Sequence, residues 1–161
     1  MSKVSELPEL PESDWDVWRT FFAMRRQLDR ALEKQLQRDA EISASDYEVL
    51  LSLFESPGKK LRAREIAEMI GWEKSRISHQ VSRMEHRGLV EKRECDEDAR
   101  GVLVTLTNDG RRAVLGAMRD HTSAIRQYFF DVLTEEEKAV LKGLSTRVLE
   151  AIDPPVCDTT S

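Results

Sequence analysis

Hydrophobic residues recur every three or four positions along most of this chain, a period that is typical of amphipathic helices. The pattern predicts helices at about 14–38, 45–55, 63–70, 74–87, 108–132 and 135–152. The run at 89–93 and the apolar, β-branched run at 102–106 flank a polar stretch and together are typical of a β-hairpin, with Leu61 as a short third strand. Polar residues able to cap helices precede four of the helices: Ser13 or Asp14, Ser43 or Ser45, Thr107 or Asn108, and Thr134.

The helix at 74–87 carries the chemistry around which the rest is organised. Ile77, Val81 and Met84 lie at i, i+4 and i+7 and form one apolar stripe. The remaining surface is cationic and hydrogen-bonding, as expected of a helix that enters the major groove of DNA. An ordinary amphipathic surface helix would show the same stripe, so the flanking segments decide between the two. The polar surface consists of Lys74, Ser75, Arg76, His79, Ser82, Arg83 and Arg87.

The flanking segments favour DNA binding. The short helix at 63–70 is followed by Gly71, which suits the left-handed position at a helix end. Two short helices joined by a glycine-containing turn form a helix-turn-helix. Gly88 gives a second helix-end signal before the hairpin. The order helix, helix, hairpin predicts a winged helix-turn-helix, in which the short strands pack on the helices.

Several motifs in the run from Arg62 to Arg111 resemble those of the MarR family of bacterial transcriptional regulators. They are Arg-Gly-Leu-Val at 87–90, Asp-x-Arg at 98–100 and Leu-Thr-x-x-Gly at 106–110, in the family's order and spacing. The resemblance covers roughly residues 14–152. It implies a homodimer held by interlocked terminal helices, most often a repressor released from DNA by a small aromatic or anionic ligand.

The fold class predicted is mainly α with a small β wing: a winged helix-turn-helix lobe plus long terminal helices that form a dimerisation lobe. Those terminal helices carry apolar stripes with too little partner surface in one subunit, which predicts a dimer. The last helix should bury Val140, Leu141, Leu144, Val148 and Leu149. The predicted parts are a flexible arm (1–12), an N-terminal dimerisation helix (13–42), a DNA-binding lobe (43–107), C-terminal dimerisation helices (108–152) and a flexible tail (153–161).

Charge is distributed unevenly along the chain. The net charge is −5 over 161 residues, which alone argues against a general nucleic-acid binder. Residues 59–93, however, contain ten basic and five acidic residues, a local charge of +5. A basic face on an acidic body can hold DNA locally and keep the protein soluble. No apolar run is long enough to span a membrane, and Met1–Glu6 shows no signal-peptide pattern, so a cytoplasmic location is expected.

Roles on DNA follow from side-chain chemistry. Arg76 can donate two hydrogen bonds to guanine, whereas Lys74 and Arg83 suit phosphate. The resemblance places Arg100 in the minor groove, with Asp98 supporting the wing turn. The sequence departs from the family at His79, often Arg, and at Ala99, often basic, and Glu73 is a poor cap that would lie near phosphate. The predicted DNA-binding set is Lys60, Lys74, Ser75, Arg76, Ser78, His79, Arg83 and Arg100.

Other chemistry has little support. The three histidines show no zinc-site spacing, and acidic neighbours of Cys95 disfavour a reactive thiolate, so no metal, cofactor or redox site is predicted. No catalytic motif occurs, and an enzyme is not expected. A small-molecule effector could bind near Trp15, Trp18, Met24, Arg25 and Tyr47, although the aromatic cluster at 15–22 also fits a core or subunit interface.

Two functions remain open at this point. The first is a sequence-specific, homodimeric transcriptional repressor that binds a palindromic operator in double-stranded DNA. The second is a winged-helix architectural or protein-interaction module without a defined operator. Their discrimination depends on whether a palindrome is bound more tightly than bulk DNA.

Overall fold

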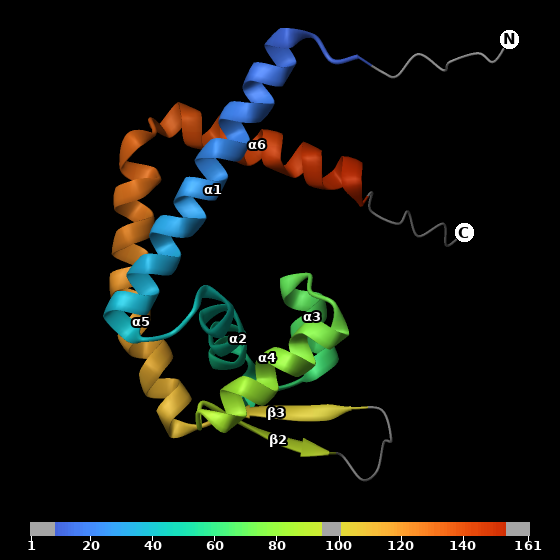
Figure 1. Ribbon diagram of the computed structural model, residues 1–161, viewed down its shortest axis with the longest axis vertical. Helices are drawn as coiled ribbons and strands as arrows, with labels where there is room; N and C mark the ends of the chain where they lie inside the picture. The colour runs from blue at the N-terminus through green and yellow to red at the C-terminus, as the bar shows by residue number, and fades with distance from the viewer. Residues whose placement is uncertain (1–8, 95–100, 154–161) are drawn as a thin grey trace, which may run out of the picture. The chain divides into compact units, whose positions relative to one another are not determined.

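The computed structural model describes residues 9–94 and 101–153 of the chain (Figure 1). These described residues fall into two compact units, which divide between Thr122 and Ser123. The predicted flexible arm falls mostly, and the tail almost entirely, outside the described residues, as do the wing residues Asp98 and Arg100. The division into arm, lobes and tail therefore stays a prediction, as does the dimer, whereas the predicted mainly α fold with a small β wing is confirmed by the elements below.

The first unit begins with the long helix α1 (Glu12–Ala40), followed by α2 (Ala44–Glu55). The predicted cap of α1 at Ser13 or Asp14 is wrong: the helix starts after Pro11, which has extended backbone angles, and no side chain caps it. Pro11 fixes that entry angle by its ring, so capping is not needed to define the helix start. The predicted cap of α2 is confirmed at Ser43, whose hydroxyl accepts a hydrogen bond from Asp46 N–H, while Asp46 accepts one from Ser43 N–H.

The helix-turn-helix is confirmed as α3 (Ala63–Ile70) and α4 (Lys74–His86). Gly71 has φ 69°, the left-handed conformation for which glycine has no steric penalty. The turn is closed by Trp72 N–H, which donates to the Ala67 carbonyl at 2.9 Å. A three-residue connection then starts α4, so the two helices pack directly on one another.

A three-stranded antiparallel sheet completes the lobe, in the order β1-β3-β2. A short 3-10 turn, η1 (Pro57–Lys59), leads into β1 (Lys60–Arg62), the predicted third strand, and β1 pairs with β3 (Val102–Leu106). On its other edge β3 pairs with β2 (Val90–Glu94), with Val104 opposite Lys92. Figure 1 shows β2 and β3 lying beside α4 within the same lobe.

One apolar core joins the helices and the sheet of this lobe. The stripe predicted for α4 is confirmed, since Ile77, Val81 and Met84 are at most 1% exposed. These side chains meet α2, α3 and the strands, and α1 adds Leu36 at its C-terminal end. Burial of each large aliphatic side chain contributes roughly 1.5–3 kcal/mol, so this stripe alone fixes the face that α4 turns to solvent. The other core side chains include Val49, Leu50, Leu53, Ile66, Val90, Val104 and Val114.

Helix α5 (Asn108–Tyr128) runs from the first unit into the second and is shorter than predicted. Its predicted end at 132 is wrong because Phe129 leaves helical geometry, and Phe130–Val132 forms the 3-10 turn η2. The predicted cap of α6 (Glu135–Ile152) is confirmed at Thr134, which accepts from Glu137 N–H. No helix among the described residues has the length and apolar character needed to cross a membrane.

The burial predicted for α6 is not found within a single chain. Val140 is 64% exposed, Val148 54% and Leu149 66%, and Leu144 is also exposed. On α1, Trp15, Val17, Trp18 and Phe21 are likewise exposed. Each of these helices therefore presents an apolar face that its own unit leaves open to solvent.

Candidate nucleic-acid interface

Helix α4 has a buried side and a polar side, as its apolar stripe requires. The buried side consists of Ile77, Gln80, Val81 and Met84. The opposite side is open to solvent over the whole length of the helix. Apart from Glu85, its residues carry ammonium, hydroxyl, imidazole or guanidinium groups that can donate to bases and phosphates: Lys74, Ser75, Arg76, Ser78, His79, Ser82, Arg83 and His86.

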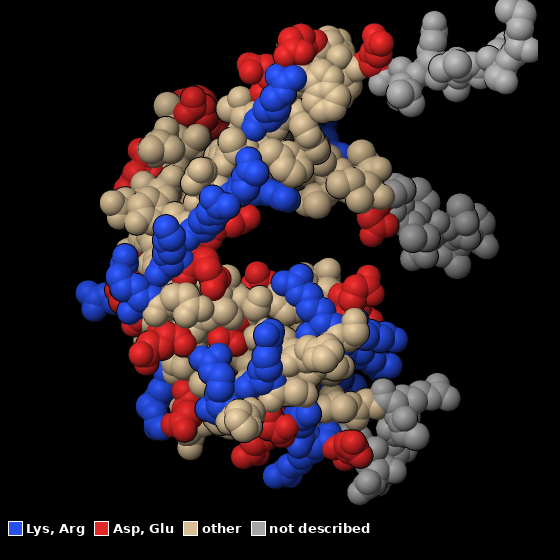
Figure 2. Space-filling model, viewed as in Figure 1, with Lys and Arg blue, Asp and Glu red and all other residues tan. Residues whose placement is uncertain are grey.

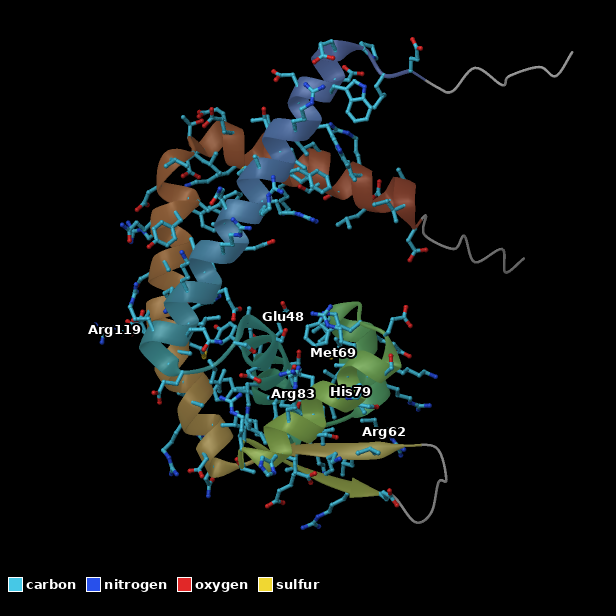
Figure 3. All side chains as sticks on the ribbon, viewed as in Figure 1. Glu48, Arg62, Met69, His79, Arg83 and Arg119 are labelled. Carbon is cyan, nitrogen blue, oxygen red and sulfur yellow. The ribbon has the colours of Figure 1, made fainter. Side chains whose placement is uncertain are left out.

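Seven of the eight predicted DNA contacts can be placed. The six on α4 are exposed, and His79 and Arg83 lie one turn apart along it (Figure 3). Lys60 is exposed at the start of β1. Figure 2 shows blue Lys and Arg side chains, with acidic ones between them, over the lobe that holds α3 and α4. The eighth, Arg100, and its predicted support Asp98 lie outside the described residues, so the wing contact stays a prediction.

The Arg76 guanidinium lies over an aromatic ring near the start of α4, and a carboxylate of α2 is near enough to interact with its charge. Its guanidinium carbon lies 3.6 Å from the centroid of the Trp72 ring, a cation–π contact. Glu48 of α2 is close enough to interact with Arg76 electrostatically: burial raises the pKa of Glu48, the charge of Arg76 lowers it in part, and Asp29 raises it further. Arg76 therefore has a defined resting position on the flank of the exposed face.

Two cations that the sequence analysis did not assign to the interface lie beside it. Arg62, at the end of β1, extends along the base of the wing, where a Cβ on Gly101 would lie 2.9 Å from its Nη1. Lys92 of β2 donates to Ser82 Oγ at 3.0 Å and thereby ties the sheet to the exposed face of α4. No local sequence signal marked either residue for this role, because only the pairing of β1 and β2 with β3 brings them to the wing.

A cavity of about 830 Å³ lies between α1, α2 and the N-terminal part of α4. Of the five residues predicted for a ligand pocket, Tyr47 lines it, whereas Trp15, Trp18, Met24 and Arg25 are not among its lining residues. Those four belong to the N-terminal half of α1, where Arg25 lies over the Phe22 ring. The cavity is lined by Asp29, Arg30, Leu32, Glu33, Lys34, Leu36, Ala44, Ser45, Tyr47, Glu48, Arg76 and His121.

His121 of α5 forms one wall of this cavity and is 8% exposed. The Gln35 amide donates to Asp39 at 3.1 Å, so its oxygen remains to accept a hydrogen bond from His121 Nδ1 at 2.9 Å. The Tyr47 ring packs against the imidazole with 4.6 Å between centroids. Burial lowers the pKa of His121, and burial raises the pKa of Tyr47, with the charge of Glu55 adding to the rise. Both groups are therefore neutral in the folded protein near pH 7.

The described part of the chain contains no cluster of three or more His, Cys, Asp or Glu side chains placed to hold a metal ion. The polar side chains of the lobe instead serve hydrogen bonding within it and the exposed face of α4.

Comparisons with known proteins point to one family. The model of the MarR family matches residues 42–102. A crystal structure of a MarR family transcriptional regulator from Streptomyces coelicolor, in complex with DNA, is 34% identical, with a TM-score of 0.87 and coverage of 96% of both chains. AbsC, another MarR family regulator from Streptomyces coelicolor, is 32% identical with a TM-score of 0.86, over 92% of this chain and 100% of that one. An uncharacterized HTH-type transcriptional regulator of Bacillus cereus (strain ZK / E33L) is 25% identical over 82% of this chain and 86% of its own length.

Proposed function

Because this chain belongs to the MarR family of transcriptional regulators, and is thus a DNA-binding regulator rather than an enzyme, we propose that it acts as a homodimeric repressor. In this proposal it binds a palindromic operator through α4 and leaves it when a small ligand binds. The observation that carries the proposal is the exposed face of α4, whose hydrogen-bonding side chains run the length of a helix with a fully buried back.

Base reading is assigned to Arg76, Ser75 and His79, and phosphate contact to Lys74, Arg83 and Lys60. Arg76 must leave the Trp72 ring to reach guanine in the major groove, which costs about 0.5–1 kcal/mol at an exposed site. Two hydrogen bonds to guanine are worth about 1–3 kcal/mol of discrimination and exceed that cost. The similar Streptomyces coelicolor regulator crystallised with DNA supports this use of the fold.

The dimer is supported by the open apolar faces of α1 and α6. Val17 is 70% exposed, Leu149 66% and Ile152 76%, more apolar surface than a single chain can leave in water without penalty. At about 25 cal/mol per Å², covering several such side chains contributes several kcal/mol to association. A twofold dimer places two copies of α4 about 34 Å apart, one DNA turn, and therefore favours a palindromic site.

The ligand is proposed to occupy the cavity beside Arg76. Its volume, about 830 Å³, suits a small organic molecule. Arg30, Lys34 and Arg76 could each pair with an anionic group, but Asp29, Glu33 and Glu48 in the same lining balance their charge. The aromatic wall at Tyr47 therefore supports a small aromatic ligand, whose anionic group, where present, would meet one of the three cations. A ligand that binds one arrangement of α4 more tightly than another shifts the population away from the DNA-binding state. A regulator of this kind must meet chromosomal DNA, so the cytoplasm is its proposed location.

The test is a competition titration. Fragments of genomic DNA are selected by the protein, the shared palindrome is synthesised, and its affinity is measured against bulk competitor DNA. The proposal expects affinity at least a thousandfold higher for the palindrome, within the range of specific regulators. Equal affinity for both DNAs would instead favour a winged-helix architectural module.

Two variants of α4 sharpen this test. Arg76→Ala should relax sequence preference, because a base contact is lost, while random DNA is bound as before. Lys74→Ala should weaken binding to both DNAs and reduce the slope of log affinity against log salt by about 0.9, the share of one phosphate contact. Equal losses on specific and random DNA for Arg76→Ala would contradict the base-reading role.

A further inference from the structure

A buried carboxylate at the start of α2 is connected to the exposed face of α4 by a chain of hydrogen bonds. Asp46 is 3% exposed, and its Oδ2 accepts from Ser43 N–H at 2.9 Å and from Arg87 Nη1 at 2.6 Å. Its Oδ1 accepts from Gln80 Nε2 at 2.6 Å. Gln80 in turn accepts, through Oε1, from Arg83 Nη2 at 2.7 Å.

The order of donors and acceptors in this chain is fixed by its buried end. A carboxylate paired with a guanidinium accepts hydrogen bonds and does not donate them. Gln80 must therefore direct its NH2 group toward Asp46, which leaves its oxygen pointing toward Arg83. If the amide were reversed, oxygen would face oxygen at Asp46 and NH2 would face the guanidinium of Arg83. The Asp46 carboxylate thus determines that Arg83 contacts the amide oxygen of Gln80 and not its NH2 group.

Gln80 cannot itself contact DNA, because it is 3% exposed on the buried side of α4. An apolar residue would fill this position without the desolvation cost of an amide, and the neighbouring buried positions Ile77, Val81 and Met84 are apolar. What the amide adds is a hydrogen bond to an exposed arginine. That bond restricts a long side chain that would otherwise have to be ordered when DNA binds.

We propose that Gln80 is a positioning residue for DNA binding: oriented by Asp46, it holds the Arg83 guanidinium in place to meet a backbone phosphate. This inference rests on the proposed contact of Arg83 with DNA, and it adds the residue that orients Arg83 before DNA binds. Arg87 donates to the other oxygen of the Asp46 carboxylate and so links the C-terminal end of α4 to α2. The Asp46 carboxylate therefore positions both α4 and, through Gln80, the Arg83 side chain.

A double-mutant cycle on the full-length protein and its selected duplex tests the proposal. Arg83→Ala should weaken binding about tenfold, as expected for a charge-assisted contact, and lower the salt slope by about 0.9. Gln80→Met keeps side-chain volume and the charge of Arg83; it should weaken binding about threefold, the effect of ordering one long side chain, with the salt slope unchanged. In the Arg83→Ala background, Gln80→Met should cause no further loss.

Arg76 provides the matched control, since it is an exposed arginine on the same helix that does not bond to Gln80. The threefold effect of Gln80→Met should persist in the Arg76→Ala background. A threefold loss that also persists in the Arg83→Ala background would overturn the proposal and leave Gln80 a purely structural role. Unchanged DNA affinity for Arg83→Ala would also overturn the proposed role of Gln80. In that case, a preference of the wild-type protein for its operator over bulk DNA would show that the proposed function still holds.

A measurement on the wild-type protein keeps the test independent of how well Gln80→Met folds. In nitrogen NMR of the unbound protein, the Arg83 guanidinium should rotate slowly about its Cζ–Nη2 bond, because that group donates to Gln80. Fast averaging of the Arg83 signals, as for an arginine without such a bond, would contradict the proposal.

Discussion

Replacement of Gly110 by alanine should destabilise the protein, although glycine to alanine inside a helix ordinarily stabilises by about 1 kcal/mol. A Cβ at Gly110 would lie 2.0 Å from the Leu89 carbonyl oxygen and 2.8 Å from Leu106 Cδ1. The Leu106 side chain can move, but the Leu89 oxygen belongs to backbone that accepts from Thr107 N–H, while the Thr107 hydroxyl donates to the Gly88 carbonyl. Separating these segments weakens two hydrogen bonds of about 1 kcal/mol each and adds overpacking of about 1–3 kcal/mol. After the helix gain of about 1 kcal/mol is subtracted, the net loss in unfolding free energy should be about 2–4 kcal/mol.

Gly116, six residues further along α5, is the matched control. A Cβ built there meets no atom within 4 Å beyond its chain neighbours and the nearby backbone of its own helix, so Gly116→Ala should raise the unfolding free energy by about 0.5–1 kcal/mol. Both variants are compared with the wild type by urea denaturation at one protein concentration, because the stability of the proposed dimer would depend on concentration. A Gly110→Ala protein as stable as the wild type, or a Gly116→Ala protein destabilised as much as Gly110→Ala, would refute the reasoning.

Three further predictions concern His121, Asp46 and Leu149. Burial lowers the pKa of His121 below 6.5, so the unfolded state binds the proton more readily than the folded state. The urea midpoint should therefore fall as pH drops below 6.5, and His121→Gln should flatten this dependence of the midpoint on pH. An identical pH dependence in the variant would argue against a buried neutral imidazole. Asp46→Ala removes the acceptor of three hydrogen bonds and should lower the unfolding free energy by about 2–4 kcal/mol in a urea titration; a loss below about 0.5 kcal/mol would show that the network contributes little. Leu149 is 66% exposed, so Leu149→Glu should leave the circular dichroism spectrum unchanged yet yield monomer by sedimentation; a dimer of wild-type strength would exclude this face from the interface.

The local elements could be predicted from sequence because their causes are local. Gly71 predicts the turn between α3 and α4, and the spacing of Ile77, Val81 and Met84 predicts the buried side of α4. That stripe also determines which side of the helix faces solvent, so the exposure of Arg76 and His79 followed directly. The start of α1 was misplaced because Ser13 and Asp14 are good capping residues, whereas Pro11 alone already fixes the entry of the chain.

Contacts between distant segments could not be predicted in the same way. The helical periodicity of apolar residues shows that Gln80 faces inward. It does not show that Asp46, 34 residues earlier in the chain, accepts a hydrogen bond from Gln80. The capping motif at Ser43 marked Asp46 as a local residue and gave no sign of its second role. Likewise, the aromatic residues of α1 suggested a ligand pocket near Trp15 and Trp18, while the cavity lies where α1 passes α2 and includes Arg76, a residue assigned to DNA.

The measurement that tests the central claim most directly is the mass and footprint of the protein on its selected duplex. Sedimentation equilibrium combined with hydroxyl-radical footprinting gives both the number of chains bound and the bases protected. The account predicts two chains per duplex and two protected half-sites about 10 base pairs apart, related by twofold symmetry. A single bound chain, or protection spread evenly along the duplex, would contradict it.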